Sequence, residues 1–348
     1  MIALMNDIAC CAPTKTPWYQ RKLVLGSIIG LIALFGFPFI TQDFLLLSYA
    51  GNLFSMMWFA ILLGLVISGF IETFIPKHYI EQLLSKNNAK TLFTAAFLGC
   101  LLSTCSHGVL AISMQLYKKG ASIPAVLVLL ASSPWANFSM TILLFSFFGS
   151  QGIIIIGLAI IIALITGFIF QILDSYQLLD TKNQPKLEEK SSFSIFEDIK
   201  KRINAYPWTK ETLKHDFKAM IQGSISISDM IIWWFIIAFV MASFLGYYIP
   251  PSIFQTYLSS SVIGLANTLG IATIIEVCSE GSSVLAFELY NQTKSIGNVF
   301  VFLLAGVATD YTEIGLVWST IGKRTAILLP LISVPLILIA GYILTITL

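Results

Sequence analysis

Charged residues are scarce in this sequence. They make up 11% of its 348 residues, whereas soluble domains carry roughly 25%. Hydrophobic residues make up 57%, and the mean hydropathy is +0.85. No strand-like alternation of apolar and polar residues is present, so we expect helices, which satisfy their own backbone hydrogen bonds in lipid. The composition excludes a soluble domain and predicts an all-α, polytopic membrane protein whose main partner is the lipid bilayer.

Arginine is rarer still, with only Arg21, Arg202 and Arg324, all near predicted cytoplasmic helix ends. A membrane enzyme that handles phosphate would need arginine at its site, so this scarcity argues against a lipid pyrophosphatase. The net charge of +2 gives no reason to expect a nucleic-acid partner.

Cysteine is also sparse, and its spacing supports neither a fixed metal site nor a structural disulfide. No C-x-x-C or H-x-x-x-H spacing supports a fixed metal, and no resident cofactor is predicted. A structural disulfide is not expected either, because no cysteine falls in a clearly extracytoplasmic loop. Cys10 and Cys11 form a vicinal dithiol in the polar N-terminal tail, where they could hand on a thiophilic ion. The five cysteines are Cys10, Cys11, Cys100, Cys105 and Cys278.

About nine hydrophobic segments divide the chain. The first lacks a small-residue cleavage site and is expected to be a retained signal-anchor helix. Four regions follow: a cytoplasmic tail at 1–22, a first helix plus repeat 1 at 23–173, a cytoplasmic basic linker at 174–222 and repeat 2 at 223–348. The linker has apolar residues at helical spacing, which predicts amphipathic helices on the membrane surface or solvated helices packed on the core. The segments are 23–40, 45–75, 92–117, 121–148, 152–173, 225–250, 253–290, 296–319 and 325–347.

A short motif occurs twice within these segments, as Cys105-Ser106-His107-Gly108 and Cys278-Ser279-Glu280-Gly281. Residues 105–137 align without gaps against 278–310, and Asn137 then faces Asp310. Fixed-interval self-similarity of this kind indicates an internal duplication. Paired polar breaks in two halves are typical of transporters built from repeats.

The charge pattern favours inverted repeats. Basic residues mark cytoplasmic helix ends, and they fall on one side if 92–117 and 253–290 each enter the membrane and return, from opposite faces. Only Lys294 then lies on the wrong side. The two broken segments would bring their tips together near the midplane. The rival arrangement, two parallel four-span units, breaks the charge rule at several loops.

The two tips carry the residue types that bind a soft or borderline ion. Cys105 and Cys278 offer thiolates, and His107 and Glu280 offer an imidazole and a carboxylate that can also carry protons. These four are the predicted metal ligands, although His107 could instead cap broken-helix carbonyls. The full substrate-binding prediction adds Ser106, Gly108, Ser279, Gly281, Glu276, Asn137 and Asp310. Two of these have an alternative role. Glu276 could serve merely to pair with His107 or a backbone donor, and Asp310 could lie at an interfacial helix end together with Glu313.

The two motifs, with Lys118-Lys119-Gly120 and Ser133-Pro134-Trp135 after the first, resemble the bacterial permease family of organoarsenical (methylarsenite) exporters. That family carries two Cys-Ser-Cys-Gly motifs, and its cysteines are implicated in binding trivalent arsenic. Here His107 and Glu280 replace the second cysteine of each motif, and the flanking prolines are absent. The resemblance covers roughly residues 50–348. It implies the fold and the permease class, but not arsenical specificity.

We therefore expect a multi-pass permease of the bacterial inner (plasma) membrane, not an enzyme. It would export a small substrate, such as a thiophilic metal or metalloid species or another small ion, by alternating access at a Cys/His/Glu midplane site. A proton is the candidate coupling ion, and a homo-oligomer is a candidate assembly. The alternatives are an intramembrane enzyme with a Cys/His site, a proton-coupled transporter of a small anion or organic molecule, and a scaffold or sensor acting through the linker.

Overall fold

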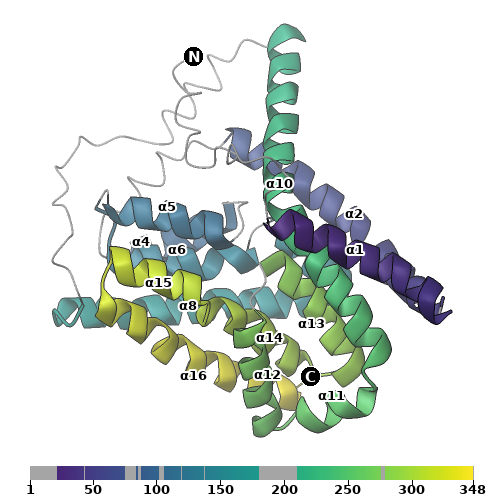
Figure 1. Cartoon of the computed structure of the whole chain (residues 1–348). Coiled ribbons are helices and arrows are strands. Elements are labelled where there is room, and N and C mark those ends of the chain that lie inside the picture. Colours follow the sequence, from purple (N-terminus) through teal and green to yellow (C-terminus); the bar gives the residue numbers. More distant parts are fainter. Residues whose placement is uncertain are drawn as a thin grey trace.

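The computed structural model describes residues 22–42, 44–74, 84, 88–101, 106–118, 120–136, 138–179, 210–275 and 279–347. This part of the chain is helical throughout, without a strand, as predicted (Figure 1). The first half contains α1 (Lys22–Thr41), α2 (Leu45–Phe74), α4 (Ala89–Leu101), α5 (Ser106–Lys118), α6 (Ile123–Ala136), α7 (Phe138–Phe148) and α8 (Ser150–Ser175). The second contains α10 (Lys210–Tyr248), α11 (Pro251–Tyr257), α12 (Val262–Ile274), α13 (Ser279–Thr293), α14 (Ile296–Ala308), α15 (Tyr311–Thr320) and α16 (Lys323–Thr347).

Within the described residues, five stretches are long and apolar enough to cross a membrane, or up to seven if each of two bent helix pairs counts as one span. The first bent pair is α6 and α7, which meet at 45° one turn after Pro134. The second is α10 and α11, which meet at 101° at Pro250 and Pro251. Proline lacks an N–H and clashes with the preceding turn, so the bend at Pro250 and Pro251 has a direct cause. The chain is a polytopic membrane protein.

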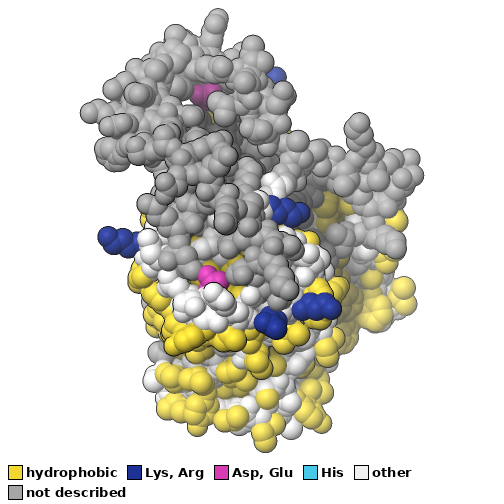
Figure 2. All heavy atoms as spheres, turned by 90° about the vertical axis from the view of Figure 1, so that its left-hand side faces the viewer, with side chains coloured by type: hydrophobic (Ala, Val, Ile, Leu, Met, Phe, Trp, Pro, Cys, Tyr) yellow, Lys and Arg dark blue, Asp and Glu magenta, His cyan; other side chains and the backbone are white. Residues whose placement is uncertain are grey.

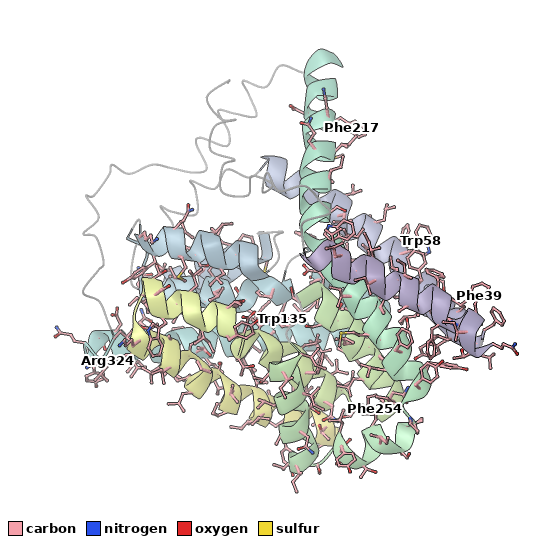
Figure 3. All side chains as sticks on the ribbon, in the orientation of Figure 1. Phe39, Trp58, Trp135, Phe217, Phe254 and Arg324 are labelled. Atoms are coloured by element: carbon pink, nitrogen blue, oxygen red, sulfur yellow. The ribbon has the colours of Figure 1, made fainter. Side chains whose placement is uncertain are left out.

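The outer surface fits a lipid environment. Large apolar side chains point outward from several helices, among them Phe39, Trp58 and Phe217, which are 69%, 48% and 60% exposed (Figure 3). On the face shown in Figure 2, hydrophobic side chains form a broad band, and Lys and Arg side chains lie along and above its upper margin. Trp135 instead lies in the centre of the bundle, 2% exposed.

The helix boundaries agree with the sequence alignment of the two halves. The ends of α4 and α12, at Leu101 and Ile274, occupy aligned positions. So do three pairs of helix starts, which are α5 with α13, α6 with α14, and α7 with α15. Each half therefore breaks its helices at the same places, as expected if one ancestral unit was duplicated.

The packing around α6 and around α14 is also equivalent in the two halves. In the first half α6 packs on α4, α5 and α8, and in the second α14 packs on α12, α13 and α16. Two contacts between the halves also correspond, since α7 touches α13 and α15 touches α5. The inverted orientation of the two units remains a prediction.

The predicted linker at 174–222 does not end in a separate amphipathic helix. Residues 180–209 lie outside the described part of the chain. The second amphipathic stretch of the predicted linker, which includes Phe217 and Ile221, forms the beginning of α10 and continues into the span without interruption. The predicted domain boundaries at 22, 173 and 222 are not tested by the helix pattern. The N-terminal tail, with Cys10 and Cys11, also lies outside the described residues.

Candidate functional site

Both predicted breaks coincide with helix ends. In the first half α4 ends at Leu101 and α5 begins at Ser106, and each helix has 13 residues. In the second half α12 ends at Ile274 and α13 begins at Ser279. A helix of 13 residues is about 20 Å long, which is too short to cross a hydrocarbon core of roughly 30 Å. Each motif therefore lies where a broken segment resumes its helix.

The predicted site residues are described to different extents. Ser106, His107 and Gly108 form the first turn of α5, but their side chains lie outside the described part of the structure. Cys105, Asn137, Glu276 and Cys278 lie wholly outside it. The predicted metal site therefore remains a prediction, because three of its four ligands cannot be placed. Among the described residues no three His, Cys, Asp or Glu side chains come together.

The first turn of α13 is described and is buried. Ser279 is 1% exposed and Glu280 is 4% exposed. The Ser279 hydroxyl donates to Oε2 of Glu280 at 3.1 Å, and the Ser283 hydroxyl donates to the backbone carbonyl of Glu280 at 2.6 Å. A carboxylate in the first turn of a helix is favoured by the partial positive charge of the helix N-terminus. This arrangement holds an acidic group inside the bundle at the second motif.

The body of α13 is enclosed by both halves. It packs against α10, α11 and α14 of its own half and against α7 of the first. Phe287 stacks on Phe147 of α7 with ring centroids 4.6 Å apart. These contacts fix the helix that carries Glu280, while α5 is held by α6 and by α15.

A second buried carboxylate, Glu288, lies two turns further along α13 and is 2% exposed. Its Oε2 accepts a hydrogen bond from the Tyr49 hydroxyl of α2, and its Oε1 accepts from Nε2 of Gln292 at 2.8 Å. Gln292 also donates to the carbonyl of Gly246 in α10 at 3.2 Å. This cluster joins α2, α10 and α13. One signal of this cluster is visible in the alignment of the two halves, where Glu288 faces Gln115 inside an apolar segment.

Asp310 and Glu313 occupy the break between α14 and α15. Asp310 is the N-cap of α15, where its Oδ1 accepts from the backbone N–H groups of Thr312 and Glu313 at 2.7 and 3.1 Å. An N-cap of this kind satisfies helix donors that would otherwise lack partners. Glu313 is 2% exposed and lines a cavity between helices of the two halves, a placement that the sequence did not reveal.

Comparison with known proteins shows which family this chain resembles. Residues 45–346 match the ArsP_1 family, whose description is "Predicted permease". The chain is 25% identical to UPF0718 protein YcgR of Bacillus subtilis over 284 residues, which cover 81% of this chain and 90% of that protein. It is 23% identical over 259 residues to a putative two-component membrane permease complex subunit of Streptococcus mutans, covering 72% and 78% of the two chains.

A third relative is putative permease Rv2963 of Mycobacterium tuberculosis, 23% identical over 66% of this chain and 59% of its own length. No solved structure matches the chain. The family match extends over both halves and both motifs and agrees with the membrane architecture. These names point to a transporter rather than an enzyme. The chain therefore belongs to the ArsP_1 family of predicted permeases.

Proposed function

We propose that this permease exports a small thiophilic species, such as a metal or metalloid compound, by alternating access between two inverted repeats. Cargo would bind at the starts of α5 and α13, which we expect to face one another. Cys105 and Cys278 would supply thiolates, and His107 and Glu280 would bind cargo or exchange protons with it. The protein would reside in the bacterial inner membrane.

The observation that carries this proposal is the buried first turn of α13. Ser279 and Glu280 lie inside an apolar bundle at the point where a broken membrane segment resumes. Ionisable groups at membrane depth are expensive and usually mark a transport route. The aligned start of α5 at Ser106 supports an equivalent role for the first motif. The crossed contacts α7–α13 and α15–α5 support a site shared by both halves.

Uptake into everted membrane vesicles tests the proposal, with methylarsenite, antimonite and Zn²⁺ as probes. We expect Cys105→Ala, His107→Ala and Glu280→Ala to reduce uptake of the transported probe by about tenfold or more, since each removes a proposed ligand. Cys100→Ala is the matched control. Its thiol lies outside both motifs and donates to the carbonyl of Ala96 within α4 at 3.4 Å. Normal uptake by all three site variants would overturn the site assignment.

An assembly of more than one chain is a further part of the proposal. One relative is named as a putative subunit of a two-component permease complex, and α1 and α2 expose large apolar side chains that a neighbouring chain could cover. We expect the purified protein to be larger than 38.4 kDa when its mass is measured without the detergent contribution. A strictly monomeric, transport-competent protein would contradict this expectation.

A further inference from the structure

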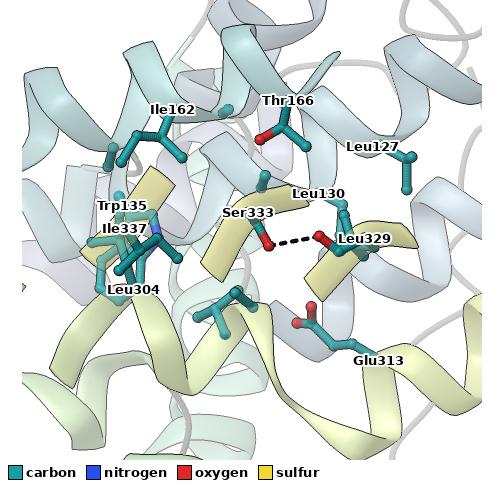
Figure 4. A pocket seen from close by; sticks show the side chains of 15 residues that line it. Leu127, Leu130, Trp135, Ile162, Thr166, Leu304, Glu313, Leu329, Ser333 and Ile337 are labelled. Atoms are coloured by element: carbon teal, nitrogen blue, oxygen red, sulfur yellow. Dashed lines mark hydrogen bonds between the residues drawn. The ribbon is translucent and has the colours of Figure 1, made fainter. Parts of the chain in front are cut away.

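A cavity lies among helices of both halves, apart from the motif residues. It has about 40 Å³ of space and is bounded by α6, α8, α14, α15 and α16 (Figure 4). Its lining is apolar except for a few groups, and the side chains that bring oxygen to it are Thr166, Glu313 and Ser333. A site that holds one water needs roughly 10–15 Å³ by this measure. The cavity is therefore large enough for one small ion with one or two waters.

Thr166 points to a ligand in this cavity. Its side chain is 2% exposed, and its hydroxyl has no hydrogen-bond partner among the described residues. Buried hydroxyl groups are normally paired, and an unpaired one beside a cavity that a carboxyl group also lines indicates bound water or an ion. Figure 4 shows Thr166 and Glu313 extending from opposite sides toward the space beside Ser333. The Ser333 hydroxyl donates to the carbonyl of Leu329 at 2.7 Å, which leaves its oxygen able to accept or coordinate.

The helix ends around the cavity favour a positive ligand. Trp135 belongs to the last turn of α6, and Val307 and Ala308 belong to the last turn of α14, and all three line the cavity. The C-terminal ends of helices carry partial negative charge, and such ends coordinate coupling ions in transporters with broken helices. The opposing N-terminus of α15 is capped by Asp310, which uses the donors of Thr312 and Glu313. An anion would therefore find little positive charge here.

We propose that this cavity binds one small monovalent cation, Na⁺ or hydronium, through the Glu313 carboxylate and the hydroxyls of Thr166 and Ser333. A single carboxylate balances a single positive charge, which disfavours a divalent ion. The inference rests on the proposed function in one respect only, the role of the cation: its movement would be coupled to that of the cargo. Binding itself is independent of transport and can be measured without knowing the cargo.

Other charged groups on the surrounding helices lie at helix ends. Lys323 and Arg324 begin α16, Lys118 ends α5, and Asp174 lies in the last turn of α8. None of these lines the cavity, and neither does Asp310, whereas Glu313 does. The side chain of His107, also on α5, lies outside the described residues. Glu313 is thus the one ionisable group among the lining side chains.

Binding of radioactive Na⁺ to the purified full-length protein tests the sodium arm, with choline chloride holding the ionic strength constant. We expect saturable binding that weakens as the pH falls, because protons compete for Glu313. Glu313→Gln and Thr166→Val should weaken it about tenfold or more, as expected for losing a hydrogen-bonding or charged partner of an ion. Thr166→Ser keeps the hydroxyl and should retain binding. Glu288→Gln removes a buried carboxylate outside the cavity, on α13, and this variant should also retain Na⁺ binding.

The hydronium arm applies if the wild-type protein binds no Na⁺. Proton uptake on acidification, followed with an indicator dye, should then be one proton smaller in Glu313→Gln. Its midpoint should move in Thr166→Val but not in Thr166→Ser. Circular dichroism confirms that each variant is folded. The proposal is overturned if Na⁺ binding ignores both Glu313→Gln and Thr166→Val, or if neither Na⁺ binding nor this pattern of proton uptake is seen. Cargo uptake in vesicles could persist in that case, so the permease function would be judged separately.

Discussion

At the scale of single residues, the contact between Tyr49 and Glu288 shows how a buried charge is accommodated in this bundle. Both carboxylate oxygens of Glu288 accept hydrogen bonds, from a phenol of α2 and from the neighbouring Gln292 of α13. Burying a carboxylate without such partners would be costly. The cluster therefore holds the outer helix α2 to the helix that carries the second motif.

Replacing Tyr49 by Phe removes the hydroxyl but keeps the ring. We expect a loss of about 1–3 kcal/mol in the free energy of unfolding, because a buried carboxylate oxygen is left without its donor. Thermal unfolding in detergent measures the effect. Tyr257→Phe is the control, since Tyr257 is 62% exposed on α11, and its stability should stay within about 0.5 kcal/mol of wild type. Equal stability of the two variants would contradict a stabilising Tyr49–Glu288 bond.

Gly246 allows this cluster to form. A Cβ atom at this position would overlap with the Glu288 carboxyl group and the Tyr49 hydroxyl. We expect Gly246→Ala to lower stability by about 1–3 kcal/mol through overpacking. Gly157→Ala in α8, where an added Cβ meets nothing within 4 Å, should be neutral or slightly stabilising, because alanine favours the helix. The same unfolding assay compares them, and a harmless Gly246→Ala would show that Glu288 can move away freely.

At the scale of helices, the sequence predicted the broken segments because glycine and polar motifs interrupt otherwise apolar runs. The ends of α4 and α12 and the starts of α5 and α13 follow those interruptions closely. The sequence predicted a connection near Pro250 and Pro251, but it did not reveal that segment 253–290 is divided into three helices. Nor did it show that the amphipathic stretch around Phe217 continues directly into the span of α10. Both features depend on how neighbouring helices pack, which periodicity alone does not encode.

The turn between α11 and α12 is held from the start of α14. Asn298 is fully buried. Its side-chain amide donates to the carbonyls of Leu258 and Ser259, the latter at 3.3 Å. We expect Asn298→Ala to cost about 1–3 kcal/mol and to speed hydrogen exchange in α11, because buried carbonyls lose their donor.

Asn267 offers a matched comparison, because its exposed amide donates to the carbonyl of Tyr257 in the same turn at 2.8 Å. Water can replace that bond, so Asn267→Ala should change stability by less than about 1 kcal/mol. Hydrogen exchange in α11 that is as slow in Asn298→Ala as in wild type would rule out the clamp.

At the scale of the whole molecule, the sequence supplied the helical membrane architecture and the division into two matching halves, because composition and self-similarity carry that information directly. It could not supply the contacts across the halves. Tyr49 and Glu288 are far apart in sequence, and Glu313 became a candidate only when α6, α8, α14 and α16 were seen to enclose it. Side-chain meetings of this kind follow from packing rather than from local pattern.

Inverted repeats predict that equivalent turns lie on opposite sides of the membrane. Lys118 ends α5 and Lys294 follows α13, and both side chains are exposed. We expect a membrane-impermeant maleimide added to intact cells to label Lys294→Cys but not Lys118→Cys, in a chain whose native cysteines are replaced. Everted vesicles should give the reverse labelling. Labelling of both positions from the same side would support parallel repeats instead.

The central claim is that the two motifs, one from each half, meet at a single site. The native Cys105 and Cys278 allow a direct test when Cys10, Cys11 and Cys100 are replaced and a protease site is inserted between residues 180 and 209. A short bis-thiol cross-linker, dibromobimane, is added to the protein in membranes, and the chain is then cut. We predict that the two halves stay joined on a denaturing gel and that joining is lost in Cys105→Ala or Cys278→Ala. Complete separation of the halves, with both cysteines shown to react singly with a maleimide, would contradict the account.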